Sequence, residues 1–166
     1  MTSSDTGAQA VPDALAYLAG NWTVERELSA GGTTGHFTGR AEFRAGDADG
    51  GWLHVEEGVL EWGGARREAG RTLRMVPLPD GSAEVSFADG RPFHTLDLRH
   101  GRWTAVHQCA ADRYEGTFTV VSPDEWHLRW EVHGPEKDQL LISTYRRART
   151  GAQRVPATGL RGCRTP

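Results

Sequence analysis

Apolar and polar residues alternate along most of this 166-residue chain. The clearest run lies at residues 125–133, where Trp126, Leu128, Trp130 and Val132 alternate with polar or charged neighbours. An alternation of period two is typical of a β-strand with one buried face. Because the same spacing recurs along the chain, the pattern predicts an all-β protein.

Short clusters of Gly, Pro, Asp and Ser interrupt the alternation at near-regular intervals. Gly31-Gly32, Gly63-Gly64 and Pro79-Asp80-Gly81 are examples, and they suit tight turns between antiparallel strands. The segments between such turns predict about ten strands, at residues 21–28, 35–44, 51–62, 65–76, 83–88, 91–98, 102–109, 113–121, 125–133 and 138–147. With no long crossover in sight, this order favours an antiparallel meander β-barrel over a sandwich.

A short helix is predicted ahead of the first strand. Pro12 suits a first-turn position and Asp13 favours a helix N-terminus, while Val11, Leu15 and Leu18 share one face. Such a helix is too short to form a second layer, but it could plug one end of a barrel. We expect a disordered N-terminus over residues 1–10, a single barrel domain over 11–148 and a flexible C-terminal tail over 149–166.

The faces predicted to point inward are not purely apolar. Their polar or titratable members are Arg26, His54, Glu56, His94, His107, Cys109 and Tyr114, and they share these faces with Trp52, Trp103, Trp126 and Trp130. A buried polar group without a partner costs a few kcal/mol, so a purely structural core rarely holds so many. A barrel interior that holds a small molecule removes this difficulty.

Proton transfer is the chemistry that these residue types serve most naturally. A carboxyl and an imidazole in a partly apolar cavity can be tuned toward neutral pH, so we predict catalytic roles for Glu56, His94, His107 and Tyr114. The ligand-binding residues are predicted to be Arg26, Trp52, His54, Trp103, Cys109, Trp126 and Trp130. The leading hypothesis is a cofactor-independent acid/base enzyme, of the cyclase or isomerase type, acting on a hydrophobic metabolite. The alternative is a non-catalytic carrier or sensor of a hydrophobic ligand, with haem among the candidates.

Simpler roles compete with each of these assignments. A single His on a strand is ordinarily a satisfied structural residue, and Cys109 could be a small apolar core residue or a thiolate nucleophile. His94, His107 and Cys109 could together bind a metal ion, but His107 and Cys109 are only two residues apart and lack the usual ligand spacing. We therefore predict no metal site and no cofactor, with haem and a metal ion as the alternatives.

Charge and targeting signals limit the partners. The net charge is −3, acids and bases are interleaved and there is no basic run, so no nucleic-acid partner is expected. No apolar run approaches membrane-spanning length, and residues 1–10 lack the apolar core of a signal peptide, so we expect a cytoplasmic protein without a membrane partner. An open strand edge would permit a homodimer.

Several motifs resemble an uncharacterised bacterial family, the domain-of-unknown-function family 6314. They are Leu18-x-Gly20-x-Trp22, His54-x-Glu56-x-Gly58, Phe87-x-Asp89-Gly90-Arg91-x-Phe93-His94-x-Leu96, His107-x-Cys109-x-x-Asp112-x-Tyr114 and Trp130-x-Val132-x-Gly134-Pro135-x-Lys137-Asp138. The likeness covers residues 15–147 and implies a lipocalin-like, or calycin-like, barrel without an established reaction. The Gly20-x-Trp22 start also resembles that of other calycin barrels, including fatty-acid-binding and haem-binding nitrobindin-type proteins.

Overall fold

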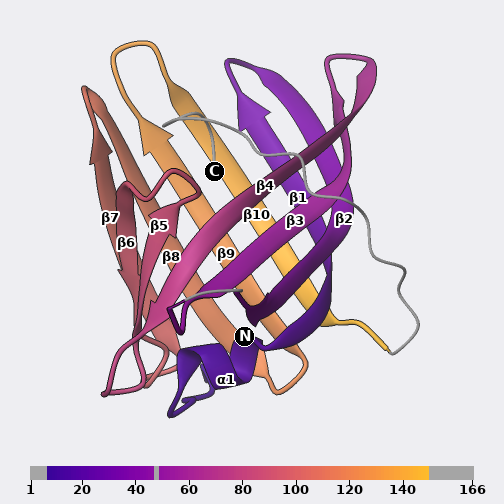
Figure 1. The fold of residues 1–166 in the computed structure, drawn as a ribbon. Helices are drawn as coiled ribbons and strands as arrows, with labels where there is room; N and C mark the ends of the chain where they lie inside the picture. Colours follow the sequence, from indigo (N-terminus) through magenta and orange to yellow (C-terminus); the bar gives the residue numbers. More distant parts are fainter. Residues whose placement is uncertain (1–6, 47–48, 150–166) are drawn as a thin grey trace, which may run out of the picture.

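One short helix and ten strands make up the computed structural model, which describes residues 7–46 and 49–149. The elements are α1 (Ala14–Leu18), β1 (Gly20–Ala30), β2 (Thr33–Ala45), β3 (Trp52–Trp62), β4 (Ala65–Pro77), β5 (Ala83–Phe87), β6 (Pro92–Leu96), β7 (Arg102–Cys109), β8 (Asp112–Ser122), β9 (Glu125–His133) and β10 (Asp138–Arg147). The strands curl round a common axis, with α1 at one end (Figure 1). The predicted all-β antiparallel barrel with a short N-terminal helix is therefore confirmed, while the predicted unstructured ends lie mostly outside the described residues.

The sheet is a meander whose first and last strands meet. Its order is β6-β5-β4-β3-β2-β1-β10-β9-β8-β7, and every neighbouring pair is antiparallel. Among the described residues no backbone ladder joins β6 to β7, so these two strands border a seam. The indole Nε1 of Trp103 on β7 donates to the carbonyl oxygen of Thr95 on β6 at 2.8 Å and bridges that seam. The barrel is thus nearly closed.

Two glycine pairs form two-residue hairpin turns. Gly31 and Gly32 join β1 to β2 with φ of +54° and +79°, and Gly63 and Gly64 join β3 to β4 with φ of +56° and +79°. Positive φ at both central residues is the geometry of a type I′ turn, which glycine adopts without steric cost. These turns fix the register of β1 with β2 and of β3 with β4.

The helix α1 covers one end of the barrel. Asp13 caps it by accepting a hydrogen bond from the backbone N–H of Ala16 at 2.9 Å, and Leu15 and Leu18 bury their side chains. The N–H of Ala14 donates to the carbonyl oxygen of Gly81 in the β4–β5 turn at 2.9 Å, which ties the helix to the rim. Within the described ranges no helix is long and apolar enough to cross a membrane.

The predicted inward faces agree with the observed burial. On β7, Ala105 is buried whereas Val106 is 47% exposed. His107 is on the same face of the strand as Ala105 and therefore points inward, as predicted. On β6, His94 keeps the inward phase of Leu96, but Phe93 is buried as well. A register shift between Val85 and Ser86 on the neighbouring strand β5 accompanies this break in alternation.

Candidate functional site

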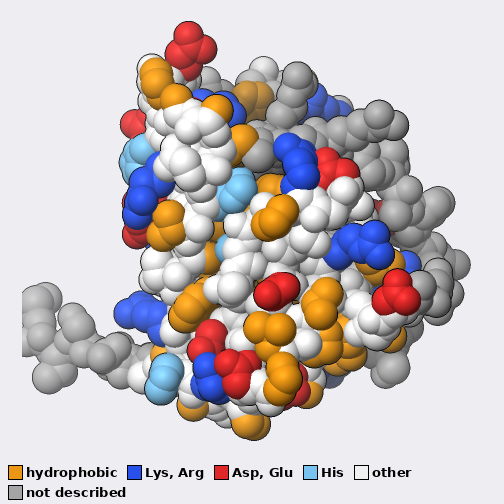
Figure 2. All heavy atoms as spheres, turned by 60° about the vertical axis from the view of Figure 1, so that its left-hand side comes forward, with side chains coloured by type: hydrophobic (Ala, Val, Ile, Leu, Met, Phe, Trp, Pro, Cys, Tyr) orange, Lys and Arg blue, Asp and Glu red, His pale blue; other side chains and the backbone are white. Residues whose placement is uncertain are grey.

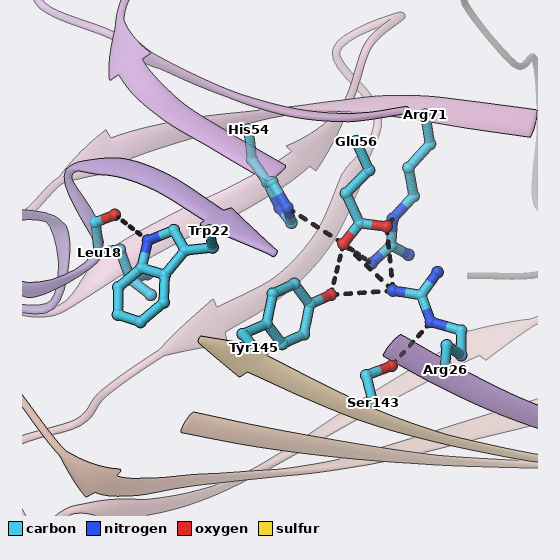
Figure 3. Close-up of polar contacts among 8 residues, drawn as sticks. All are labelled: Leu18, Trp22, Arg26, His54, Glu56, Arg71, Ser143 and Tyr145. Carbon is cyan, nitrogen blue, oxygen red and sulfur yellow. Dashed lines mark hydrogen bonds and ion pairs between the residues drawn. The ribbon is translucent and has the colours of Figure 1, made fainter. Parts of the chain in front are cut away.

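A buried carboxylate on β3, Glu56, lies at the centre of the interior polar groups (Figure 3). Its side chain is 1% exposed. Nη2 of Arg26 on β1 contacts both carboxylate oxygens, at 2.9 and 3.1 Å, and the hydroxyl of Tyr145 on β10 donates to Oε1. Arg71 lies directly across the β3–β4 ladder from Glu56, with Nη2 at 3.4 Å from Oε1 and Nε at 3.3 Å from Oε2. Four strands thus contribute to one ion-pair network.

The remaining contacts hold Arg26 and His54 in place. Nε of Arg26 donates to Oγ of Ser143 at 2.7 Å, because the β1–β10 register places these residues opposite each other. His54 precedes Glu56 on the same face and stacks on Phe43 with ring centroids 4.0 Å apart. Its Nε2 lies 3.3 Å from Oε1 of Glu56, close enough for an ion pair but outside hydrogen-bond geometry. We refer to Arg26, His54, Glu56, Arg71, Ser143 and Tyr145 as the Glu56 cluster.

The electrostatics of the cluster fix its protonation at neutral pH. Burial by itself raises the pKa of Glu56, but the charges of Arg26 and Arg71 outweigh it and hold this pKa well below the usual range. Burial, reinforced by Glu56, raises the pKa of Tyr145, so the phenol stays protonated and donates. Burial lowers the pKa of His54, which leaves its imidazole neutral. Glu56 is therefore a fixed negative charge and a poor proton donor.

A small cavity of about 20 Å³ lies between the Glu56 cluster and α1. It is lined by Leu18, Phe43, His54, Arg71, Leu73, Met75, Val85, Phe93, His94, Leu96, Phe118, Trp126, Leu128 and Trp130. The walls are thus aromatic and aliphatic apart from three nitrogen-bearing side chains. The volume is close to that needed for a single water molecule.

His94 is the lining residue best suited to accept a proton. Its Nδ1 lies 2.7 Å from the carbonyl oxygen of Thr95, and because a carbonyl can only accept, Nδ1 carries the hydrogen. That assignment leaves Nε2 with its lone pair. Burial lowers the pKa of His94 to about 4, so the ring is neutral at physiological pH.

The other predicted catalytic residues form a separate contact. His107 on β7 and Tyr114 on β8 are cross-strand partners with ring centroids 5.8 Å apart, and neither belongs to the Glu56 cluster or the cavity lining. Nζ of Lys137 lies 3.5 Å from the Tyr114 hydroxyl and 3.2 Å from Asp112. His107 also packs against Phe93, which lines the cavity, with ring centroids 5.1 Å apart, so the four predicted catalytic residues lie in two adjacent groups.

The predicted ligand-binding residues are divided in the same way. Arg26 and His54 join the cluster, and Trp126 and Trp130 line the cavity. The others are only partly buried at the margin of the core: Trp52 at the start of β3, Trp103 at the seam and Cys109 at the end of β7. No free cysteine occurs among the described residues. The part of the chain that the structure describes also contains no group of three or more His, Cys, Asp or Glu side chains placed to hold a metal ion.

Three members of the cluster were absent from the sequence-based prediction: Arg71, Ser143 and Tyr145. The signal for them was present, since Arg71 shares its phase with Leu73 and Met75, and Ser143 and Tyr145 share theirs with Leu141. Alternation alone does not show that Arg71 lies opposite Glu56, because this pairing depends on the β3–β4 register.

Comparisons with known proteins place the chain in a sequence family and a fold. The profile of a family described as "Family of unknown function (DUF6314)" matches residues 18–147. No curated protein matches the sequence. Among solved structures, an S-type phycobiliprotein lyase from Guillardia theta matches with a TM-score of 0.64 and 10% identity, over 91% of this chain and 99% of the lyase.

Two further structures match less well. A protein of unknown function from the DUF3598 family of Nostoc punctiforme gives a TM-score of 0.47 at 12% identity, over 86% of this chain and 51% of that one. A redesigned β-barrel bound to DFHBI gives a TM-score of 0.43 at 16% identity, over 79% and 99% of the two chains. At such identities the likeness to the lyase shows a shared barrel fold, and the function must be argued from the site.

Proposed function

This chain belongs to the family of unknown function DUF6314, and we propose that it is a barrel that binds a hydrophobic, aromatic small molecule in its interior. One observation carries the proposal. His54, Arg71 and His94 converge on a cavity whose other walls are aromatic or aliphatic. An apolar wall with a few converging polar groups is the usual composition of a small-molecule site.

Unsatisfied polar atoms support a ligand over a purely structural core. Nε2 of His54 and Nε of Arg71 are buried and make no hydrogen bond within the described residues. Nearly all buried polar groups in folded proteins are paired, and an unpaired one costs ~1–3 kcal/mol. Both atoms lie 3.3 Å from an oxygen of Glu56, and a ligand acceptor at this wall would complete the pairing of the Arg71 guanidinium.

A ligand of ordinary size requires the interior to rearrange. Small-molecule pockets commonly measure ~300–1,000 Å³, whereas this cavity measures about 20 Å³. Toward the end opposite α1, the inward residues Leu28, Leu60 and Phe87 are only partly buried, so the interior is least tightly closed there. We expect access from that end, with lining side chains turning aside as the ligand enters.

His94 supports a second candidate function, an acid/base enzyme of the isomerase or cyclase type. A neutral imidazole with a lone pair on Nε2, on the wall of a cavity, is suited to accept a proton from a bound substrate. In such an enzyme Glu56 would position Arg26, Arg71 and Tyr145 and would transfer no proton itself, because its pKa is held low.

A neutral fluorescent probe, N-phenyl-1-naphthylamine, tests interior binding. We expect saturable one-to-one binding to the wild-type protein, weakened several-fold by Leu128→Phe, because Leu128 lines the cavity and a larger side chain would fill it. Arg129→Phe is the matched control, since it adds the same ring to the exposed face of the same strand. Failure of the folded wild-type protein to bind the probe would refute the proposal, as would equal binding by the two variants.

A further inference from the structure

The Glu56 cluster contains more positive charges than negative charges. Arg26 and Arg71 are cationic, since arginine keeps its proton in proteins, and Glu56 is the single anion beside them. His54 is neutral because burial lowers its pKa, and Tyr145 stays protonated. The cluster therefore retains one positive charge inside the barrel, in an environment where an uncompensated charge is costly.

The two arginines differ in how fully their donors are used. Arg26 donates from Nε to Ser143 at 2.7 Å and from Nη2 to Glu56 and Tyr145 at 2.9 Å each. Arg71 makes one long hydrogen bond of 3.4 Å to Glu56 from Nη2, and its Nε lies 3.3 Å from the same carboxylate without hydrogen-bond geometry. Only Arg71 of the two lines the cavity. The Arg71 guanidinium thus borders the cavity and has N–H donors that make no hydrogen bond within the cluster.

Two arginines on the outer surface have closer carboxylate partners than Arg71 has. Charged side chains of both signs are mixed over the face in Figure 2. The guanidinium of Arg99 lies 2.7 Å from Asp97, and that of Arg129 lies 2.6 Å from Glu131. Each of these exposed cations has a close carboxylate, although water already solvates it. Arg71, inside the barrel, lies 3.3 Å from Glu56 and shares this carboxylate with Arg26.

We propose that Arg71 binds the anionic group of the ligand, so that the protein selects hydrophobic, aromatic monoanions such as carboxylates or sulfonates. This inference rests on the proposed binding function. A guanidinium offers a planar fork that matches a carboxylate or sulfonate, and one excess positive charge is balanced by one negative charge. The apolar body of the ligand would lie against Phe118, Trp126 and Trp130 on the facing wall.

Two probes that share a skeleton isolate the anionic group. N-phenyl-1-naphthylamine is neutral, and 8-anilino-1-naphthalenesulfonate adds one sulfonate to the same ring system. We expect the wild-type protein to bind the sulfonate ~10-fold or more tightly than the neutral probe, since a hydrogen bond to a charged group contributes ~1.5–3 kcal/mol. We expect Arg71→Gln to abolish this preference, so that the variant binds the two probes with equal affinity.

Arg74→Gln is the matched control, because Arg74 lies three residues along β4 on the exposed face. It should keep the wild-type preference. Arg71→Gln should fold as stably as the wild type, since it removes the excess charge; Arg71→Met provides a second variant if it does not. Equal affinity of the wild-type protein for both probes, or a preference that survives both Arg71 substitutions, would overturn the assignment. If neither probe binds the wild type, the proposed binding function itself fails.

Discussion

At the scale of single residues, Glu56 and Arg71 face each other across one ladder and have opposite consequences for stability. Glu56 is the counter-charge for two arginines, so its loss leaves two buried cations without an anion. Arg71 is the cation in excess, so its loss restores neutrality. Glu56 thus stabilises the fold, whereas the neighbouring Arg71 has a charge that the fold does not need.

Glu56→Gln should lower the free energy of unfolding by about 3–5 kcal/mol, the usual cost of removing one partner of a buried ion pair. Urea unfolding followed by tryptophan fluorescence measures this loss. Glu61→Gln, on the same strand with an exposed carboxylate, should change stability by less than ~1 kcal/mol. A loss at Glu56 no greater than that at Glu61 would show that the carboxylate is not a necessary counter-charge.

His94 makes stability depend on pH in a defined window. Its pKa is lowered to about 4 in the folded protein, against an ordinary value near 6.5. Between these values the unfolded chain takes up a proton that the folded protein does not, so stability falls as the pH drops from about 6.5 to about 4. The loss is up to ~3 kcal/mol.

The variant His94→Asn should remove this part of the pH dependence, while His54 contributes in the same direction and remains. The readout is the urea midpoint measured across the window. His36→Asn, at an exposed position on β2, should leave the profile unchanged. An identical slope in the His94 and His36 variants would contradict the assignment of a neutral buried imidazole.

At the scale of elements, alternation and turn glycines are sufficient to predict the ten strands and most of their inward faces. The apolar runs have period two, and tight turns such as Gly31-Gly32 leave little freedom in register. The site was harder to predict, because cross-strand partners are set by three-dimensional pairing. Arg26 meets Ser143 across 117 residues of chain, through a β1–β10 ladder that no local pattern reveals.

At β6, a register shift in the neighbouring strand limits what alternation can predict. The register shift between Val85 and Ser86 on β5 lets both Phe93 and His94 reach the cavity lining, which strict alternation would not allow. Sequence alternation therefore places His94 on the inward face but overlooks Phe93. At the neighbouring seam, side-chain contacts such as Trp103 with Thr95 take the place of a backbone ladder.

At the scale of the whole molecule, the barrel separates two kinds of polar residue. The face shown in Figure 2 mixes both signs of charge, whereas the interior holds one excess cation beside aromatic walls. α1 covers one end, and the partly buried inward residues Leu28, Leu60 and Phe87 lie toward the other. This arrangement is what a site for a hydrophobic anion requires: a shielded charge, an apolar enclosure and one end by which to enter.

The most direct test locates a bound anion inside the barrel. The ¹⁵N-labelled protein is titrated with 8-anilino-1-naphthalenesulfonate, and the tryptophan indole resonances are followed in ¹H–¹⁵N spectra. Each of the six tryptophans is assigned by its Trp→Phe variant. We predict saturable shifts for Trp126 and Trp130, which line the cavity, and none for Trp62, which borders a groove at the hairpin tips. Shifts confined to Trp62, or no shift at the two cavity indoles under saturating probe, would contradict binding inside the barrel.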